Sequence, residues 1–96
     1  MTELASVRAV VYGRVQGVFF RAFVEEQARK LGLTGYVRNV AGKEAVEAWA
    51  EGEKAKLTAL IDYLRVGPPA ARVTGVNTTW SEYTGRYPDF SIRYQY

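Results

Sequence analysis

Apolar residues recur along the chain with two spacings, one typical of strands and one typical of helices. Alternating apolar and polar residues, rich in β-branched and aromatic side chains, predict strands, whereas apolar residues three and four positions apart predict amphipathic helices. The segments with strand-like patterns are residues 7–13, 35–40, 45–51, 72–80 and 90–94. The segments with helical spacing are residues 20–31 and 53–66.

Both predicted helices are followed by a glycine and carry a stripe of apolar residues. Gly32 follows the first stripe at the position of a C-cap glycine. Gly67-Pro68-Pro69 ends the second helix, because proline lacks the backbone N–H that a continuing helix needs. The stripes that we expect to be buried are Phe20, Phe23, Val24, Ala28 and Leu31 in the first helix and Leu57, Leu60, Ile61 and Leu64 in the second.

The order of these elements predicts the fold class. It is β-α-β-β-α-β followed by a short C-terminal strand, which is typical of an α+β protein with the ferredoxin-like plait, an antiparallel sheet with both helices on one face. We expect one domain over residues 1–96, with the polar fourth strand at an edge. In the third strand, Glu47 and Glu51 lie on the face opposite the small apolar residues. Plaits host many unrelated functions, so the fold alone leaves the chemistry open.

The composition restricts the chemistry that the chain can perform. The 96 residues are 48% hydrophobic and 24% charged, which is typical of a single globular domain. The chain has no cysteine and no histidine. Thiolate nucleophiles, disulfides, imidazole acids and bases, and zinc sites built from Cys or His are therefore excluded. Catalysis would depend on carboxylates, Lys, Arg, amides, hydroxyls or backbone N–H groups, and we expect neither a metal nor a cofactor.

The net charge of +3 reflects a mild excess of 13 basic over 10 acidic residues. The basic residues are scattered, so the charge suits a small anionic ligand as well as it suits nucleic acid. Residues 1–8 form no apolar run like that of a signal peptide, and no segment approaches the roughly 20 apolar residues that cross a bilayer. We therefore expect a cytoplasmic protein without a membrane partner, and a monomer.

Residues 13–21 join the first strand to the first helix and are the strongest candidate for a functional site. Glycines bracket a short loop that leads into a helix N-terminus, where backbone N–H groups lack partners within the helix and the helix dipole is positive. We expect these N–H groups and the planar guanidinium of Arg21 to form a cradle for a phosphate-sized anion. In the alternative interpretation, the glycines only relieve backbone strain in a turn and Arg21 is a solvated surface residue.

The residues of this loop also resemble those of a known family. Gly-Arg-Val-Gln-Gly-Val-Phe-Phe-Arg, residues 13–21, strongly resembles the first signature of the acylphosphatase family. Gly-Tyr-Val-Arg-Asn, residues 35–39, resembles the second. Residues 67–70 and 90–94 are further similarities, so the resemblance extends from about Val7 to Tyr94.

The resemblance implies an enzyme that hydrolyses small acyl phosphates to a carboxylate and inorganic phosphate, without a metal or a covalent intermediate. It implies that Arg21 binds the phosphate and that Asn39 orients the attacking water. It also implies that phosphate oxygens are held by the backbone N–H groups of Val15, Gln16, Gly17, Val18, Phe19 and Phe20. After Asn39 the sequence departs from the family pattern. The turn glycine, Gly42, comes early and the hairpin is one residue longer, which leaves the turn type and the register of residues 40–46 open.

The sequence also leaves alternatives open. Glu25 or Glu26 would be a general base in one of them, although both lie on the predicted solvated face of the first helix, and we favour a phosphate oxygen of the substrate as proton acceptor. Tyr36 and Trp49, on adjacent strands, form either an RNA-stacking platform or ordinary packing, and we favour packing and no nucleic-acid partner. A further alternative is a catalytically silent domain that senses anions.

Overall fold

The elements of the fold follow the order predicted from the sequence. The computed structural model describes residues 2–94. Its strands are β1 (Leu4–Arg14), β2 (Thr34–Asn39), β3 (Ala45–Glu53), β4 (Arg72–Ser81) and β5 (Phe90–Arg93). Its helices are α1 (Phe20–Lys30) and α2 (Lys54–Val66). The predicted order is confirmed, although β1 begins at Leu4 rather than at Val7.

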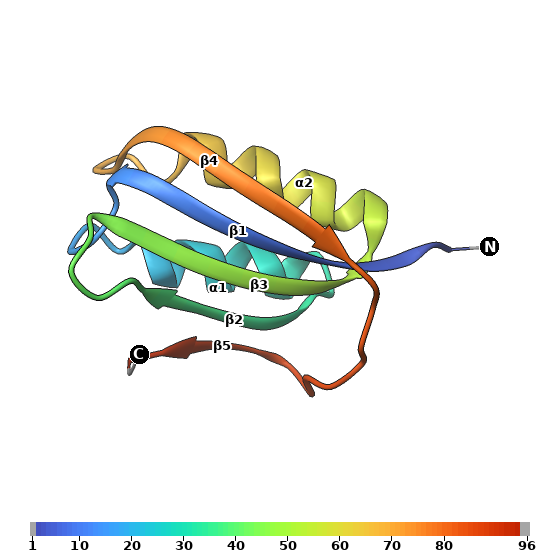
Figure 1. Ribbon diagram of the computed structural model, residues 1–96. Coiled ribbons are helices and arrows are strands. Elements are labelled where there is room, and N and C mark those ends of the chain that lie inside the picture. Colours follow the sequence, from blue (N-terminus) through green and yellow to red (C-terminus); the bar gives the residue numbers. More distant parts are fainter. Residues whose placement is uncertain (1, 95–96) are drawn as a thin grey trace.

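The strands form one mixed sheet in the order β4-β1-β3-β2-β5 (Figure 1). The pairs β1–β4, β1–β3 and β2–β3 are antiparallel, but β5 pairs with β2 in parallel, with Gly35 opposite Phe90. The expectation of an entirely antiparallel sheet is therefore wrong at β5. The connection after β4 passes across one end of the sheet before β5 begins, so β5 runs in the same direction as β2. The prediction that β4 lies at an edge is confirmed.

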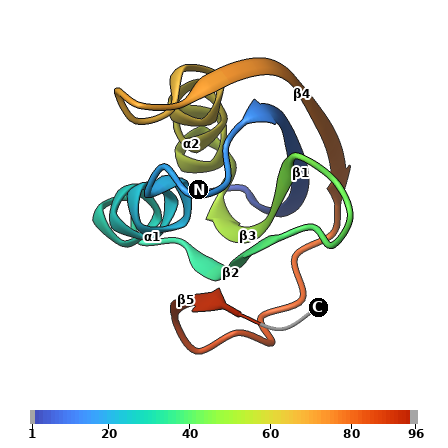
Figure 2. The same ribbon diagram turned by 90° about the vertical axis from the view of Figure 1, so that its left-hand side faces the viewer.

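Both helices cover the same face of the sheet (Figure 2), and the core lies between them and the strands. The apolar stripes of the helices meet the inward-facing residues of β1, β2 and β3 there. The fully or nearly fully buried residues of the two stripes are Phe20, Val24, Ala28, Leu57, Leu60, Ile61 and Leu64. Phe23 and Leu31 pack at the margin of this core. Neither helix within residues 2–94 has the length and apolar character to cross a membrane.

Three strands of the sheet point the same way. β1 and β2 are both antiparallel to β3 and therefore share a direction, and β5 is parallel to β2. Their carboxyl ends thus lie at one end of the sheet, next to the first turn of α1 (Figure 1). The topology therefore brings together the loop after β1, the last residue of β2 and the end of β5.

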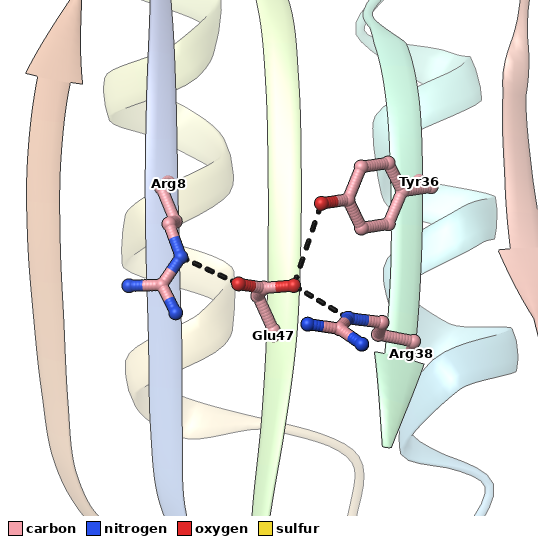
Figure 3. Close-up of polar contacts among 4 residues, drawn as sticks. All are labelled: Arg8, Tyr36, Arg38 and Glu47. Atoms are coloured by element: carbon pink, nitrogen blue, oxygen red, sulfur yellow. Dashed lines mark hydrogen bonds and ion pairs between the residues drawn. The ribbon is translucent and has the colours of Figure 1, made fainter. Parts of the chain in front are cut away.

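The open face of the sheet carries a buried glutamate between two arginines (Figure 3). Glu47 on β3 is 3% exposed, and its carboxylate accepts hydrogen bonds from Arg8 Nε at 2.5 Å and Arg38 Nε at 2.6 Å. The hydroxyl of Tyr36 donates to the same carboxylate at 3.4 Å. Burial acts to raise the pKa of Glu47, but the hydrogen bonds from Arg38 and Arg8 outweigh it and hold this pKa below its ordinary value. Charged side chains thus join the three central strands.

A second buried carboxylate, Glu51 on β3, fixes the connection between β4 and β5. It accepts hydrogen bonds from the backbone N–H groups of Thr84 and Gly85, both at 3.0 Å, and from the hydroxyls of Ser6 and Thr84. Burial acts to raise the pKa of Glu51, but these hydrogen bonds outweigh it and lower the pKa. Because Glu51 holds the connection against β1 and β3, the chain is directed back toward β2.

We predict that Glu51→Gln lowers the free energy of unfolding by about 1–3 kcal/mol at pH 7, because an amide cannot accept all of these hydrogen bonds. A carboxylate with a lowered pKa stabilises the fold above its unfolded pKa of about 4.3, and this contribution is lost as the pH falls through the folded pKa. The difference between wild type and variant should therefore shrink from pH 5 to pH 3 in urea unfolding. Glu82→Gln, at an exposed neighbour with the same charge change, is the control. A pH-independent difference would contradict the prediction.

Candidate active site

The backbone of the loop between β1 and α1 alternates between left-handed and other conformations. Gly17 has φ 72°, and Phe19 has φ 62° and ψ 25°, so both are left-handed, whereas Val18 between them is not. Alternation of this kind forms a nest, in which successive N–H groups converge on an anion. Within residues 2–94, Phe19 is the only residue other than glycine with a positive φ, and such a conformation costs on the order of 1–3 kcal/mol. Strain of this kind is typical of functional loops.

The N–H groups of this loop are available to a ligand. Among the described residues, the backbone N–H groups of residues 15–19 donate no hydrogen bond to other backbone groups. The first turn of α1 adds unpaired donors and the positive end of the helix dipole, and it contains no acidic residue. The side chains of Val15, Val18 and Phe20 are buried in the core and hold the loop in place. We refer to the backbone of residues 15–20 as the cradle.

Arg21 lies in the first turn of α1, beside the cradle. Its Nη1 donates to the backbone carbonyl oxygen of Arg93 at 3.4 Å, and its guanidinium carbon lies 4.9 Å from the centre of the Tyr94 ring. No carboxylate within residues 2–94 forms an ion pair with Arg21. The end of β5 thus orients the guanidinium, while its remaining N–H donors can bind an anion.

Asn39 is the last residue of β2 and lines the same cavity as Arg21. Its partner on β3 is Val46, which is fully buried on the helix side, so the side chain of Asn39 lies on that side too. Asn39 Oδ1 is buried and accepts no hydrogen bond from the described part of the chain. Since a buried polar atom is stabilised only by a partner, this oxygen is suited to accept a hydrogen bond from a water molecule.

A cavity of about 300 Å³ connects these groups. The residues that line it are Val15, Gly17, Phe19, Phe20, Arg21, Ala22, Asn39, Ile92 and Tyr94. The structure therefore brings together Arg21, Asn39 and most of the predicted loop. The side chain of Val18 instead joins the core, and that of Gln16 extends to the β2–β3 hairpin. Of the described residues that line the cavity, none is acidic.

The two glutamates considered as a general base lie elsewhere on α1. Glu25 pairs with Arg29 at 3.4 Å, and Glu26 pairs with Lys30 at 3.6 Å. Neither glutamate lines the cavity. Within residues 2–94, acidic side chains do not cluster in threes as metal ligands would. The polar side chains of the described residues that line the cavity are therefore a guanidinium, an amide and the phenol of Tyr94, and the loop adds backbone N–H groups.

The structure gives the register of the hairpin after Asn39, which the sequence leaves open. Asn39 pairs with Val46, and residues 40–44 connect the two strands. Lys43 N donates to Val40 O at 3.4 Å. Gly42 has φ 74° while the residue before it has no positive φ, and this combination is typical of a type II turn. The early glycine thus occupies the position at which this turn favours glycine.

The aromatic residues of the open face are engaged by contacts within the chain. Tyr36 and Trp49 are paired across β2 and β3. The Arg93 guanidinium lies 4.0 Å from the centre of the Tyr36 ring, and the Tyr87 ring centre lies 5.9 Å from it. A nucleic-acid base would have to displace Arg93 to stack there. This arrangement favours packing over an RNA-binding platform.

The contact between Arg21 and the end of β5 was not predicted from the sequence. Residues 90–94 were assigned only as a closing strand. The contact exists because β5 is parallel to β2 and ends beside α1, and the alternation of residues in a short strand carries no information about its direction. No local signal would have revealed it.

The fold and the cavity together define a class of protein. It is a small ferredoxin-like α+β fold that places an arginine, an asparagine and a nest of backbone N–H groups around one cavity, in a chain without imidazole or thiol.

Known proteins match this description. The family model described as Acylphosphatase matches residues 7–92. An acylphosphatase of Anaeromyxobacter sp. (strain Fw109-5) is 51% identical over 94 residues, which are 98% of this chain and 100% of that protein. Acylphosphatase structures from Coxiella burnetii and Bacillus subtilis each have a TM-score of 0.89 and 38% identity. The first match covers 95% of this chain and 94% of that one, the second 94% and 99%. The chain belongs to the acylphosphatase family.

We predict that Phe19→Gly is more stable than Phe19→Ala by about 1 kcal/mol, because only glycine adopts the left-handed region without steric cost. The comparison of Gly with Ala removes the effect of losing the ring, which is 83% exposed. Phosphate affinity should stay close to that of wild type in Phe19→Gly. Urea unfolding measures the stability of the variants, and calorimetry measures their phosphate affinity. Ala59→Gly in α2 is the control and should show the ordinary order, with Ala more stable. The same order at residue 19 would contradict the prediction.

Proposed function

We propose that this acylphosphatase hydrolyses the anhydride bond of small acyl phosphates by direct attack of water on phosphorus. The oxygen of water forms a bond to phosphorus, the bond from phosphorus to the acyl oxygen breaks, and the products are a carboxylate and inorganic phosphate. The observation that carries the proposal is the convergence of the cradle, Arg21 and Asn39 on one cavity.

The main task of the site is to stabilise charge on the phosphoryl oxygens. In phosphoryl transfer this charge is spread over three equatorial oxygens, and fixed donors stabilise it best because they need no reorganisation during the reaction. The N–H groups of residues 15–20 belong to a backbone that the buried side chains of Val15, Val18 and Phe20 hold in place. Arg21 adds charge and a planar pair of donors that match two phosphate oxygens.

The attacking water is held by Asn39. Its buried Oδ1 accepts a hydrogen from the water and fixes the oxygen lone pair toward phosphorus. The proton then passes to an oxygen of the phosphoryl group, since no described residue that lines the cavity has a carboxylate to accept it. The placement of Glu25 and Glu26 in ion pairs along α1 supports this substrate-assisted transfer.

The leaving group explains why such a simple site suffices. A carboxylate is a weak base and departs without protonation, so an acyl phosphate needs no general acid. An alkoxide or phenoxide is far more basic, and the described residues that line the cavity include no carboxylic acid to protonate it. The site therefore favours anhydrides over phosphate monoesters. The single domain over residues 1–96, the cytoplasmic location and the monomeric state expected from the sequence stay predictions.

We predict that the protein releases phosphate from benzoyl phosphate in the presence of EDTA, and that Arg21→Ala lowers kcat by at least about 10²–10³-fold. The guanidinium is a charged donor to the transition state, and loss of one such donor typically has this effect. Arg21→Ala should also weaken the binding of inorganic phosphate. Phosphate release and calorimetry are the measurements.

Two controls make this assay specific. Phenyl phosphate, a monoester with the same ring, should not be hydrolysed at a comparable rate. Arg65→Ala removes an exposed arginine from α2 and should leave kcat unchanged. Phosphate binding by wild type without any turnover would indicate the silent anion-sensing domain, and wild-type turnover in Arg21→Ala would refute the role of Arg21.

For Asn39→Ala we predict a different pattern, because Asn39 contacts water rather than phosphate. kcat should fall by about 10²-fold while the Kd of inorganic phosphate changes less than about twofold, which is a loss specific to the transition state. Asn77→Ala, at an exposed asparagine of β4, is the matched control. A parallel loss of phosphate affinity would mean that Asn39 binds the phosphate itself.

A further inference from the structure

The side chain of Gln16 connects the cradle to the hairpin that follows Asn39. Its Nε2 lies 2.8 Å from the carbonyl oxygens of Lys43 and Ala45, and 3.2 Å from that of Val40. These carbonyl groups surround the β2–β3 turn, which begins directly after Asn39. We propose that Gln16 is a positioning residue that fixes the separation between the phosphate in the cradle and the water on Asn39. The proposal rests on the function proposed above.

The cradle keeps its shape without this side chain. Val15 and Phe20, on either side of Gln16, are each 1% exposed, so core packing anchors the loop at both ends. The carbonyl oxygen of Phe19 also accepts a hydrogen bond from the N–H of Phe23 at 3.1 Å, which joins the loop to α1. Removal of the Gln16 amide therefore leaves the phosphate-binding groups in place.

The hairpin depends more strongly on Gln16. Residues 41–44 are exposed. Within the described chain, the turn is closed by two backbone hydrogen bonds, from Val40 N to Ala45 O at 3.0 Å and from Lys43 N to Val40 O at 3.4 Å. From outside the turn, Gln16 Nε2 contacts both of these acceptor oxygens and also the carbonyl oxygen of Lys43, and thereby fixes the turn against the loop.

Sheet pairing fixes the two ends of the hairpin, since Asn39 pairs with Val46 and Ala45 pairs with Tyr12 on β1, but the turn itself has fewer links to β1. The N–H of Gly13 donates to Glu44 O at 3.3 Å, which is longer than the two 2.8 Å contacts of Gln16. The Gln16 amide has two N–H donors, and these match the two shorter contacts. Its loss lets the turn move relative to the cradle, and with it the side chain of Asn39, the last paired residue of β2. A displacement of about 1 Å in a reacting geometry can cost about 10²-fold in rate.

The test is a double-mutant cycle between Gln16→Ala and Asn39→Ala. We expect Gln16→Ala to lower kcat for benzoyl phosphate by about 10-fold to 100-fold and to change the Kd of inorganic phosphate less than about twofold. In the Asn39→Ala background, where no amide holds the water, Gln16→Ala should lower kcat less than about twofold. A purely structural role would give the same loss in both backgrounds.

Two outcomes would overturn the proposal. One is a cycle in which the two losses multiply. The other is a loss of phosphate affinity in Gln16→Ala that equals its loss of kcat, because Gln16 would then act on the cradle. Gln16→Met keeps the length of the side chain but has no hydrogen-bond donor, so it should behave like Gln16→Ala. If Gln16→Ala does not fold, Gln16→Met is used in the cycle instead. Gln27→Ala changes a glutamine that lies on α1, away from the hairpin; it is the matched control and should keep the wild-type kcat.

The failure of this proposal is distinguishable from the failure of the proposed function. Wild type that releases no phosphate from benzoyl phosphate refutes the function, whereas wild-type turnover with a multiplicative cycle refutes only the role of Gln16.

Hydrogen exchange adds a measurement that does not depend on turnover. The Val40 amide should exchange at least about tenfold faster in Gln16→Ala, while the Val24 amide in α1 should not change. Unchanged exchange at Val40 would contradict the proposal.

Discussion

The left-handed backbone at Phe19 is the constraint on which the site depends. A chain without histidine or cysteine can bind a phosphoryl group with backbone N–H groups, but these converge only where left-handed residues alternate with others. Gly17 adopts this conformation freely and Phe19 does not. The neighbours of Phe19 hold it there, since Val18 and Phe20 are buried in the core on either side. Core packing thus determines the shape of the proposed anion site.

The direction of β5 links a second part of the fold to the same site. An antiparallel β5 would end at the opposite end of the sheet, far from Arg21, whereas the parallel strand brings the Arg93 carbonyl group to the guanidinium. Glu51 supports this direction because it binds Thr84 and Gly85 in the connection before β5. A buried carboxylate remote from the cavity therefore contributes to the orientation of Arg21.

Features that depend on neighbouring residues could be predicted from the sequence, and features that depend on distant ones could not. The helices, their glycine stops and the loop of residues 13–21 are continuous in sequence, so local patterns identify them. The burial of Glu47 and Glu51 could not be read from β3, because it depends on Arg8 and Arg38 in one case and on the β4–β5 connection in the other. The contacts of the Gln16 side chain could not be predicted for the same reason. Its partners lie in a hairpin far along the chain, so the sequence indicates a role only for its backbone N–H group.

The division of the site into a cradle and a water holder explains how so few groups can catalyse rather than only bind. In the proposed mechanism the cradle and Arg21 contact the phosphoryl oxygens throughout the reaction, and they raise kcat to the extent that these contacts strengthen as charge develops in the transition state. The water on Asn39 differs, because its bond to phosphorus begins to form only in the transition state. Catalysis therefore also depends on the distance between the two parts, one of which follows β1 while the other ends β2. Side chains that span this gap, as Gln16 does, affect the rate without touching the reacting atoms.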